Sequence, residues 1–321
     1  MRKFALLLLI AACGKDPAMS GDDTMTPDGS TGSNDPSATF ELKSPDILLP
    51  AGAEFTKCFY FHTPNTQTVA VNKWISDMTP GSHHMIMFLT PNESSPPADG
   101  TIDENCGGVG GGGGLPAWTF ASATEHYEMD MPDDDGSGKP LAQNIPPNTA
   151  GYIQMHYLNA SDTDKMVHVD LKAYAIDAAT AYTQTDAYVT YVYNFTVPAG
   201  ATGYQVNGSC STPSGSKFWM VSSHTHKQGV DVKINDGSSM IYDNTDWEHP
   251  AVKDWSAPSF YSFSSNKVSW TCTYDNASGP DVPEGQSAAH NEMCMATGYY
   301  FPASGPKFNV VIGNGGSCQS F

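Results

Sequence analysis

Two histidines spaced two residues apart could hold a metal ion. His224 and His226 lie in the run SSHTHKQGV, which has the composition of a strand. Residues i and i+2 of a strand point to the same face, about 6.6 Å apart, so both imidazoles can reach one ion while Thr225 turns away. The pair suits zinc, copper or nickel. Such pairs are also a common accident of protein surfaces, so other segments must supply further ligands.

Adjacent histidines form a second candidate, His83 and His84 in the run PGSHHMIMFL. Neighbouring residues of a regular strand face opposite ways, so both can bind one ion only if the backbone bends there. Pro80 and Gly81, directly upstream, would allow a bent start of the strand. Without such a bend, one histidine is buried and the other is exposed.

Two more segments carry single candidates. His156 lies in GYIQMHYLN, with Gln154 on the same face of the expected strand, and Met293 directly precedes Cys294 in NEMCMATGYYFP. A thioether is a weak ligand except for soft ions such as Cu(I), so a lone methionine usually only fills a core.

In their order, the four segments resemble the copper type II, ascorbate-dependent monooxygenases, the family of peptidylglycine α-hydroxylating monooxygenase and dopamine β-monooxygenase. The matching motifs are H-H-M at 83–85, Q-x-H-Y at 154–157, H-T-H at 224–226, and E-M-C at 292–294 followed by Y-Y at 299–300. The resemblance extends over nearly all of the chain from about residue 40 onward. Each motif is short, but the four occur in the family's order.

The resemblance implies two copper ions per chain, each in its own domain. The expected ligands are His83, His84 and His156 for a three-histidine site, and His224, His226 and Met293 for a second site. The second set would be catalytic, because a thioether favours Cu(I), the state that binds dioxygen. The three-histidine site would store an electron. Gln154 is the expected partner that orients His156.

The family reaction is hydroxylation of an unactivated C–H bond with dioxygen and ascorbate, and we expect this reaction on a small organic substrate. Peptide-amidating members hold a substrate carboxylate with an Arg, an Asn and a Tyr, where this chain has Ser222, Met295 and Thr297. A buried carboxylate without a partner is costly, so a peptide substrate is disfavoured. Met295, Tyr299 and Tyr300 instead favour a neutral or aromatic small molecule.

Two alternatives remain open at this point. The chain could be a non-catalytic copper-binding lipoprotein on the same scaffold that buffers or delivers copper. It could also be a β-sandwich adhesin with incidental histidines. The other histidines match no family ligand, and the nearest candidates for extra metal contacts are His126 and His290; the full set is His62, His126, His168, His249 and His290.

The elements that must position these residues read as strands. The chain has 30 glycines and 23 prolines, and no long segment has the apolar period of a helix. VHVDLKAYAI and YVTYVYNFTV alternate apolar residues over 167–175 and 189–197, as half-buried strands do. We therefore expect an all-β chain. The resemblance implies two antiparallel β-sandwich domains, jelly-roll-like in topology, that face each other across an open, solvent-filled cleft.

A polar connection near residues 177–187 divides the folded part into an N-terminal copper domain at 39–182 and a C-terminal copper domain at 183–321. The glycine-rich run at 106–118 lacks the Lys and Ser/Thr of a phosphate-binding loop, so we expect a long mobile loop. Residues 13–38 have almost nothing to bury and should form a disordered tether.

The N-terminus reads as an export signal. Residues 1–12 have a basic start and a short apolar run, and the run before Cys13 resembles a bacterial lipoprotein signal, which implies cleavage there and lipidation of Cys13. An ordinary secretory signal is the alternative. We expect a chain that is lipid-anchored to a bacterial membrane, at the outer membrane or cell surface, or else secreted.

Export also changes how the cysteines are read, because disulfides persist outside the cytosol. The six cysteines other than Cys13 could form three bridges, and no C-x-x-C spacing indicates a cysteine-rich metal site. The pairs that the resemblance implies are Cys58–Cys106, Cys210–Cys318 and Cys272–Cys294.

The formal net charge of −19 excludes nucleic acid as a natural partner, because a phosphate backbone would be repelled. The expected partners are the substrate and dioxygen, with membrane contact through the lipid anchor only. We expect a monomer.

Overall fold

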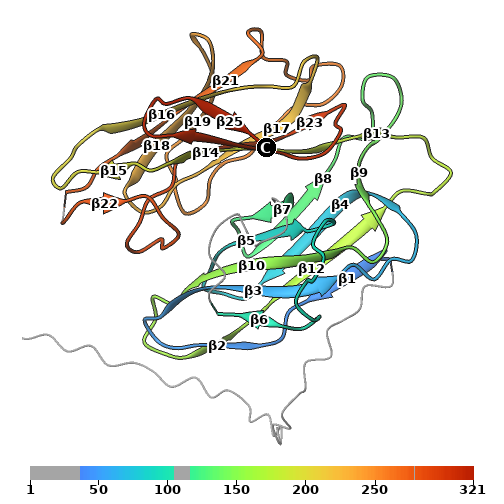
Figure 1. Cartoon of the computed structure of the whole chain (residues 1–321), viewed down its shortest axis with the longest axis horizontal. Coiled ribbons are helices and arrows are strands. Elements are labelled where there is room, and N and C mark those ends of the chain that lie inside the picture. The colour runs from blue at the N-terminus through green and yellow to red at the C-terminus, as the bar shows by residue number, and fades with distance from the viewer. Residues whose placement is uncertain (1–36, 105–115, 278) are drawn as a thin grey trace, which may run out of the picture. The chain divides into compact units, whose positions relative to one another are not determined.

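The computed structural model describes residues 37–104, 116–277 and 279–321, and their regular secondary structure consists of strands (Figure 1). The expected all-β class is confirmed. Within these ranges, no helix is long and apolar enough to cross a membrane. The signal segment, Cys13, the tether up to residue 36, Cys106 and most of the glycine-rich run lie outside the described residues.

Strands from the first half of the chain pair only with one another. One sheet has the order β1 (Phe40–Lys43), β12 (Val169–Ala175), β4 (Val69–Met78), β9 (Leu141–Ile145), β13 (Thr183–Gln184), with β8 (His126–Asp130) also on β4. A second has the order β6 (Ile102–Asp103), β3 (Glu54–His62), β10 (Ala150–Leu158), β5 (Ser82–Leu89), β7 (Ala117–Ser122). β2 (Ile47–Leu49) pairs with β11 (Lys165–Val167).

Strands from the second half form three further sheets. The first has the order β20 (Lys253–Asp254), β17 (Lys217–His224), β23 (Met295–Phe301), β14 (Asp186–Tyr193), β24 (Lys307–Ile312), β25 (Cys318–Ser320). The next has the order β16 (Tyr204–Ser211), β21 (Lys267–Tyr274), β18 (Gly229–Asp236), β19 (Ser239–Asn244), and β15 (Thr196–Val197) pairs with β22 (Val282–Pro283). The pairing partners thus change between β13 and β14.

The two alternating runs behave differently in the structure. Along β12, buried Val169, Leu171 and Ala173 alternate with partly exposed residues, as predicted. In contrast, β14 is buried on both faces because its alternate residues pack into two different apolar clusters, Val189 and Tyr191 into one and Tyr188 and Val192 into the other. The run predicted over 189–197 is wrong beyond Tyr193, because Asn194 has a φ of 62° and ends the strand.

A buried apolar cluster joins the two groups of sheets. It contains Met85 and Phe120 from the first group together with Tyr191, Met295 and Tyr299 from the second. The Tyr299 hydroxyl donates a hydrogen bond to the carbonyl of Thr119 at 3.1 Å. Buried side chains fill this contact, and the open, solvent-filled cleft that the resemblance implies is not confirmed. The jelly-roll-like sandwich topology stays a prediction.

Two of the three expected disulfides are confirmed. Cys210 on β16 bonds to Cys318 on β25, and Cys272 on β21 bonds to Cys294, which directly precedes β23. Their Cα atoms lie 5.4 and 5.8 Å apart, within the normal range. The Cys58–Cys106 pair includes a residue outside the described ranges and stays a prediction.

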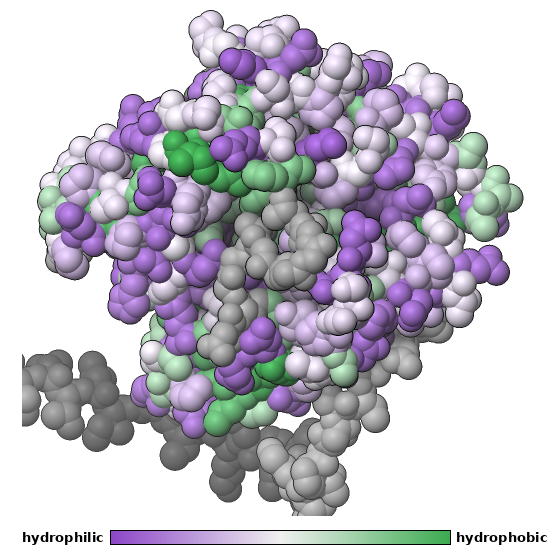
Figure 2. Space-filling view, viewed as in Figure 1, coloured by the Kyte–Doolittle hydropathy of each residue, from purple (hydrophilic) through white to green (hydrophobic). Residues whose placement is uncertain are grey.

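The surface is mostly hydrophilic on the face shown in Figure 2, with scattered hydrophobic residues. Among the larger apolar side chains that are exposed, Leu48 and Met166 lie opposite each other on β2 and β11. Apolar residues otherwise line the interior, including one cavity that borders the histidines.

Candidate metal centre

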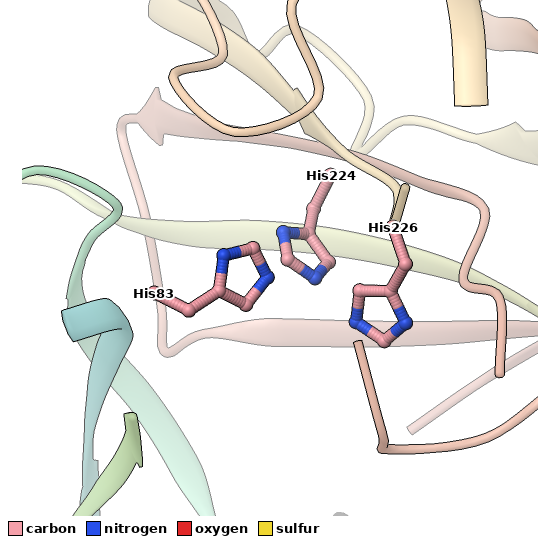
Figure 3. A group of neighbouring side chains, drawn as sticks. All are labelled: His83, His224 and His226. Carbon is pink, nitrogen blue, oxygen red and sulfur yellow. The ribbon is translucent and has the colours of Figure 1, made fainter. Parts of the chain in front are cut away.

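Five histidines from distant parts of the sequence lie together in the interior. The imidazole of His83 has its centroid 4.9 Å from that of His84, 5.0 Å from His156 and 5.4 Å from His224. His224 and His226 are 5.1 Å apart, and Figure 3 shows that their rings approach His83 from the other group of sheets. The candidates from three of the four motifs therefore form one continuous cluster.

A β-bulge explains how two adjacent histidines join the same cluster. In the pairing of β5 with β10, Ser82 lies opposite Tyr157 and His84 lies opposite His156, which leaves His83 as the extra residue. Two residues that oppose one across a bulge can turn their side chains to the same side. Gly81, with a φ of 104°, precedes the bulge, so the predicted bend at the start of this strand is present.

His224 and His226 are positioned by a strand end and a turn. β17 ends at His224, so the predicted strand through His226 is wrong. The carboxylate of Glu292 accepts hydrogen bonds from the backbone N–H of His226 at 2.9 Å and of Gln228 at 2.7 Å, which holds the turn. Nδ1 of His226 lies 3.1 Å from the carbonyl oxygen of Asn291. If that nitrogen donates, Nε2 is left free to bind a metal.

His83 contributes to two possible ligand sets. Potential ligand atoms of His83, His84 and His156 all lie within 4.8 Å of one another, and the same holds for His83, His224 and His226. Met293 is buried, and its carbonyl accepts a hydrogen bond from the Tyr274 hydroxyl at 2.6 Å. The role of the Met293 thioether as a ligand stays a prediction, whereas the structure brings His83 to the place expected for a third ligand.

The imidazoles have the protonation state that metal binding requires. Burial lowers the pKa values of His83, His84 and His224 well below the usual range and lowers that of His226 to about 4. These rings are therefore neutral at pH 7, and neutral imidazole is the form that ligates metals.

Four ring nitrogens of the cluster are buried without a hydrogen-bond partner in the described structure. They are Nε2 of His83, His224 and His226, and Nδ1 of His84. Buried polar atoms without partners are rare and costly in native proteins. A metal ion would satisfy them, and an all-imidazole donor set suits copper, among other transition metals.

Sequence reasoning missed Glu54, the hydrogen-bond partner of His156. Nε2 of His156 lies 2.7 Å from Oε1 of Glu54, on β3. Burial alone would raise the pKa of Glu54, but hydrogen bonds from His156 and Ser287 outweigh it and lower this pKa to about 2. The charged carboxylate accepts a hydrogen bond from the Nε2–H group of His156. Nδ1 of His156 then carries no proton and is available to a metal.

The predicted partner of His156 was Gln154, which is buried on β10. The hydrogen bond of His156 goes to Glu54 instead, and the role of Gln154 stays a prediction. Glu54 and His156 are far apart in the sequence and meet only because β3 pairs with β10. No local motif could have revealed this contact.

Three other histidines have surface partners. His62, His126 and His168 each place Nδ1 2.6 to 2.7 Å from an aspartate, namely Asp99, Asp77 and Asp46. His126, a candidate for an extra metal contact, also has Nε2 3.4 Å from Glu128. These pairs are not part of the buried cluster.

An apolar cavity of about 120 Å³ borders the cluster. Its wall includes His84 and His224, one from each ligand set, the three positions compared above with substrate-binding residues, and Tyr299. The three positions are Ser222, Met295 and Thr297. Tyr300 is not in this wall; its hydroxyl donates to the carbonyl of Gly305.

No family model and no curated protein matches this chain. Among solved structures, it has a likeness to the major capsid protein P2 of bacteriophage PM2, with 7% identity and a TM-score of 0.32, over 81% of this chain and 96% of that one. The PBSX exported protein XepA matches with 8% identity and a TM-score of 0.21, over 81% of this chain and 86% of that one. Both likenesses are too weak to carry an argument about fold or function.

Proposed function

We propose that this chain is a copper-dependent monooxygenase that uses dioxygen and a reductant such as ascorbate to hydroxylate a C–H bond of a small organic substrate. The observation that carries the proposal is the cluster of five histidines, four of them buried and His224 partly buried, with unpartnered ring nitrogens, beside an apolar cavity. His83, His84 and His156 would hold one copper, and His224 and His226 with Met293 would hold the other.

Copper, when bound, would supply one-electron redox chemistry and the activation of dioxygen. The chain's own residues would prepare the site for it. Glu54 holds the proton on Nε2 of His156, and Glu292 holds the turn that carries His226. The apolar cavity would bring a substrate against His84 and His224 while excluding water.

The proposal is tested by copper content and ascorbate-driven oxygen consumption of the chain without its N-terminal signal, together with detection of a hydroxylated product. We expect Met293→Ala to keep the fold and about half of the copper, because the thioether belongs to one site only, and to abolish turnover. Unchanged turnover would remove Met293 from the mechanism.

A non-catalytic copper-binding protein is the second candidate. The deep burial of the cluster favours it, since His156 is 1% exposed and His226 is fully buried, and buried ligands retain metal well. Copper binding without any product from ascorbate and dioxygen would select this alternative.

We also propose export as a lipoprotein anchored through Cys13. The two disulfides support an oxidising compartment. Metabolic labelling with a fatty acid should modify the wild type but not Cys13→Ser; equal labelling of both would exclude an anchor at this residue.

A further inference from the structure

We propose that the cavity beside His84 and His224 selects a small, neutral, apolar molecule and rejects both carboxylates and ammonium ions. This inference rests on the proposed function and names the substrate class of that site. It begins from the two histidines in the cavity wall, one from each ligand set. A molecule in the cavity would therefore lie next to both sets.

The wall offers a charged ligand no counter-charge. None of the described residues that line the cavity is Lys, Arg, Asp or Glu, and much of the wall consists of apolar side chains such as Ile86, Trp118, Val252 and Met295. Burying an ion without a partner is far more costly than burying a neutral group. No side chain of the wall would thus compensate a carboxylate or an ammonium ion for its lost hydration.

Most hydroxyl groups of the wall are already engaged within the protein. Ser222 donates to the carbonyl of Ala251 at 2.9 Å, and Ser122 donates to the carbonyl of Thr124 at 3.0 Å. Tyr299 donates to the carbonyl of Thr119. A strongly polar ligand would have to compete with these bonds, whereas an apolar ligand would leave them intact.

The size of the cavity limits the ligand. At about 120 Å³ it is slightly smaller than an engineered apolar cavity of roughly 150 Å³ that stays dry and binds benzene in another protein. A single aromatic ring or a short branched hydrocarbon is therefore the largest group that fits. The rest of a larger molecule would have to extend out of the cavity.

An acidic hollow adjoins the cavity and would favour a cationic ligand. It shares Tyr127, Met220 and Val252 with the cavity, and it is lined by Glu128, Asp130, Asp133 and Asp254. An aromatic amine could place its ring in the cavity and its ammonium group in this hollow. Tight binding of an amine is therefore the outcome that would overturn the inference.

The test is equilibrium binding of toluene, benzylamine and benzoate, which share one ring and carry zero, positive and negative charge at pH 7. Binding is measured by ligand-observed NMR with the copper-loaded chain and again after metal removal. In the metal-free chain, where no copper charge adjoins the cavity, we expect toluene to bind at least about 10-fold more tightly than either ion, because neither ion gains a charged partner from the wall. Equal or tighter binding of benzylamine or benzoate to the metal-free chain would refute the inference.

Matched variants locate the binding site. Ala121→Leu and Thr297→Leu each place a larger side chain in the wall and so reduce the space in the cavity. Each should therefore weaken toluene binding by at least about 10-fold. Met295→Leu conserves side-chain volume and should change the affinity for toluene by less than about 3-fold. Thermal unfolding verifies that each variant is folded. Toluene binding that neither enlarged side chain alters would place the ligand elsewhere and overturn the proposal.

The outcome is separable from that of the proposed function. A chain that binds toluene through this cavity but yields no hydroxylated product fails as a monooxygenase and keeps its ligand preference. A chain that turns over with ascorbate but prefers benzylamine remains a monooxygenase and loses the proposed substrate class.

Discussion

The two histidine sets are held in place by different means. His83, His84 and His156 lie on β5 and β10, where paired backbone hydrogen bonds on both sides of β10 fix the register. His224 and His226 lie at a strand end and in a turn, held by Glu292 and by the disulfide next to Met293. Sheet pairing thus holds the whole first set, whereas in the second set it holds only His224, and Glu292 holds the turn that carries His226.

A substitution at His83 should affect both histidine sets, because this residue lies within reach of both. We expect His83→Ala to weaken copper binding at both by about 1,000-fold, about 4 kcal/mol, more than the loss of an outer partner. Competition with a Cu(I) chelator measures the affinities. His62→Ala, which removes a surface histidine, is the control. Loss at the three-histidine set alone would mean that His224, His226 and Met293 hold their copper without His83.

The Cys272–Cys294 disulfide should matter for the second set only. It closes a loop of 22 residues, so replacing both cysteines with alanine should lower the free energy of unfolding by about 3 kcal/mol, measured by urea denaturation. Copper affinity should fall at His224 and His226 and remain unchanged at His84 and His156.

The Cys210–Cys318 pair is the matched control for that variant. It joins β16 and β25, neither of which carries a histidine of the cluster. Its removal should destabilise the fold without selective loss of copper from the second set. A selective loss in this control would show that general destabilisation, and not the local tie, explains the effect.

Glu292→Gln tests the turn more gently. One acceptor oxygen is replaced by an NH₂ group that faces backbone N–H donors, so the turn loses a hydrogen bond at His226 or Gln228. We expect copper affinity at the second set to fall about 10- to 100-fold, while the first set is unaffected. Glu284→Gln, at a carboxylate that accepts from the Tyr191 hydroxyl, is the control and should preserve both affinities.

The smallest expected effect concerns Glu54, which connects His156 to the segment that precedes Met293. Its carboxylate accepts from His156 and also from Ser287 and the backbone N–H of Ala288. Because its pKa falls from 4.5 to about 2 on folding, it stabilises the protein above about pH 4.5, and this contribution is lost as the pH falls through 2.

We expect this contribution to be about 1 to 2 kcal/mol, since partial exposure screens the carboxylate. The metal-free wild type should therefore lose more unfolding free energy between about pH 5 and 2 than metal-free Glu54→Gln. Urea denaturation across this range measures both. Parallel pH profiles would mean that the hydrogen bonds of Glu54 contribute nothing to folding.

The sequence alone predicts the strands with local alternation and the residues of the histidine cluster. It does not predict that β14 is buried on both faces, because that depends on what packs against each face of its sheet. The motifs also assign His83 and His224 to different metal sites, because their order in the sequence contains no information about the distance between sheets. The Glu54 contact likewise arises only from strand pairing.

The bulge at His83 has an evolutionary consequence. His83 is the surplus residue in the pairing of β5 with β10, so deleting a single codon would restore an uninterrupted ladder and remove a histidine common to both sets. The sheet can therefore be inherited without the metal site. In a sheet that already carried His84 and His156, one inserted residue would complete the first ligand set.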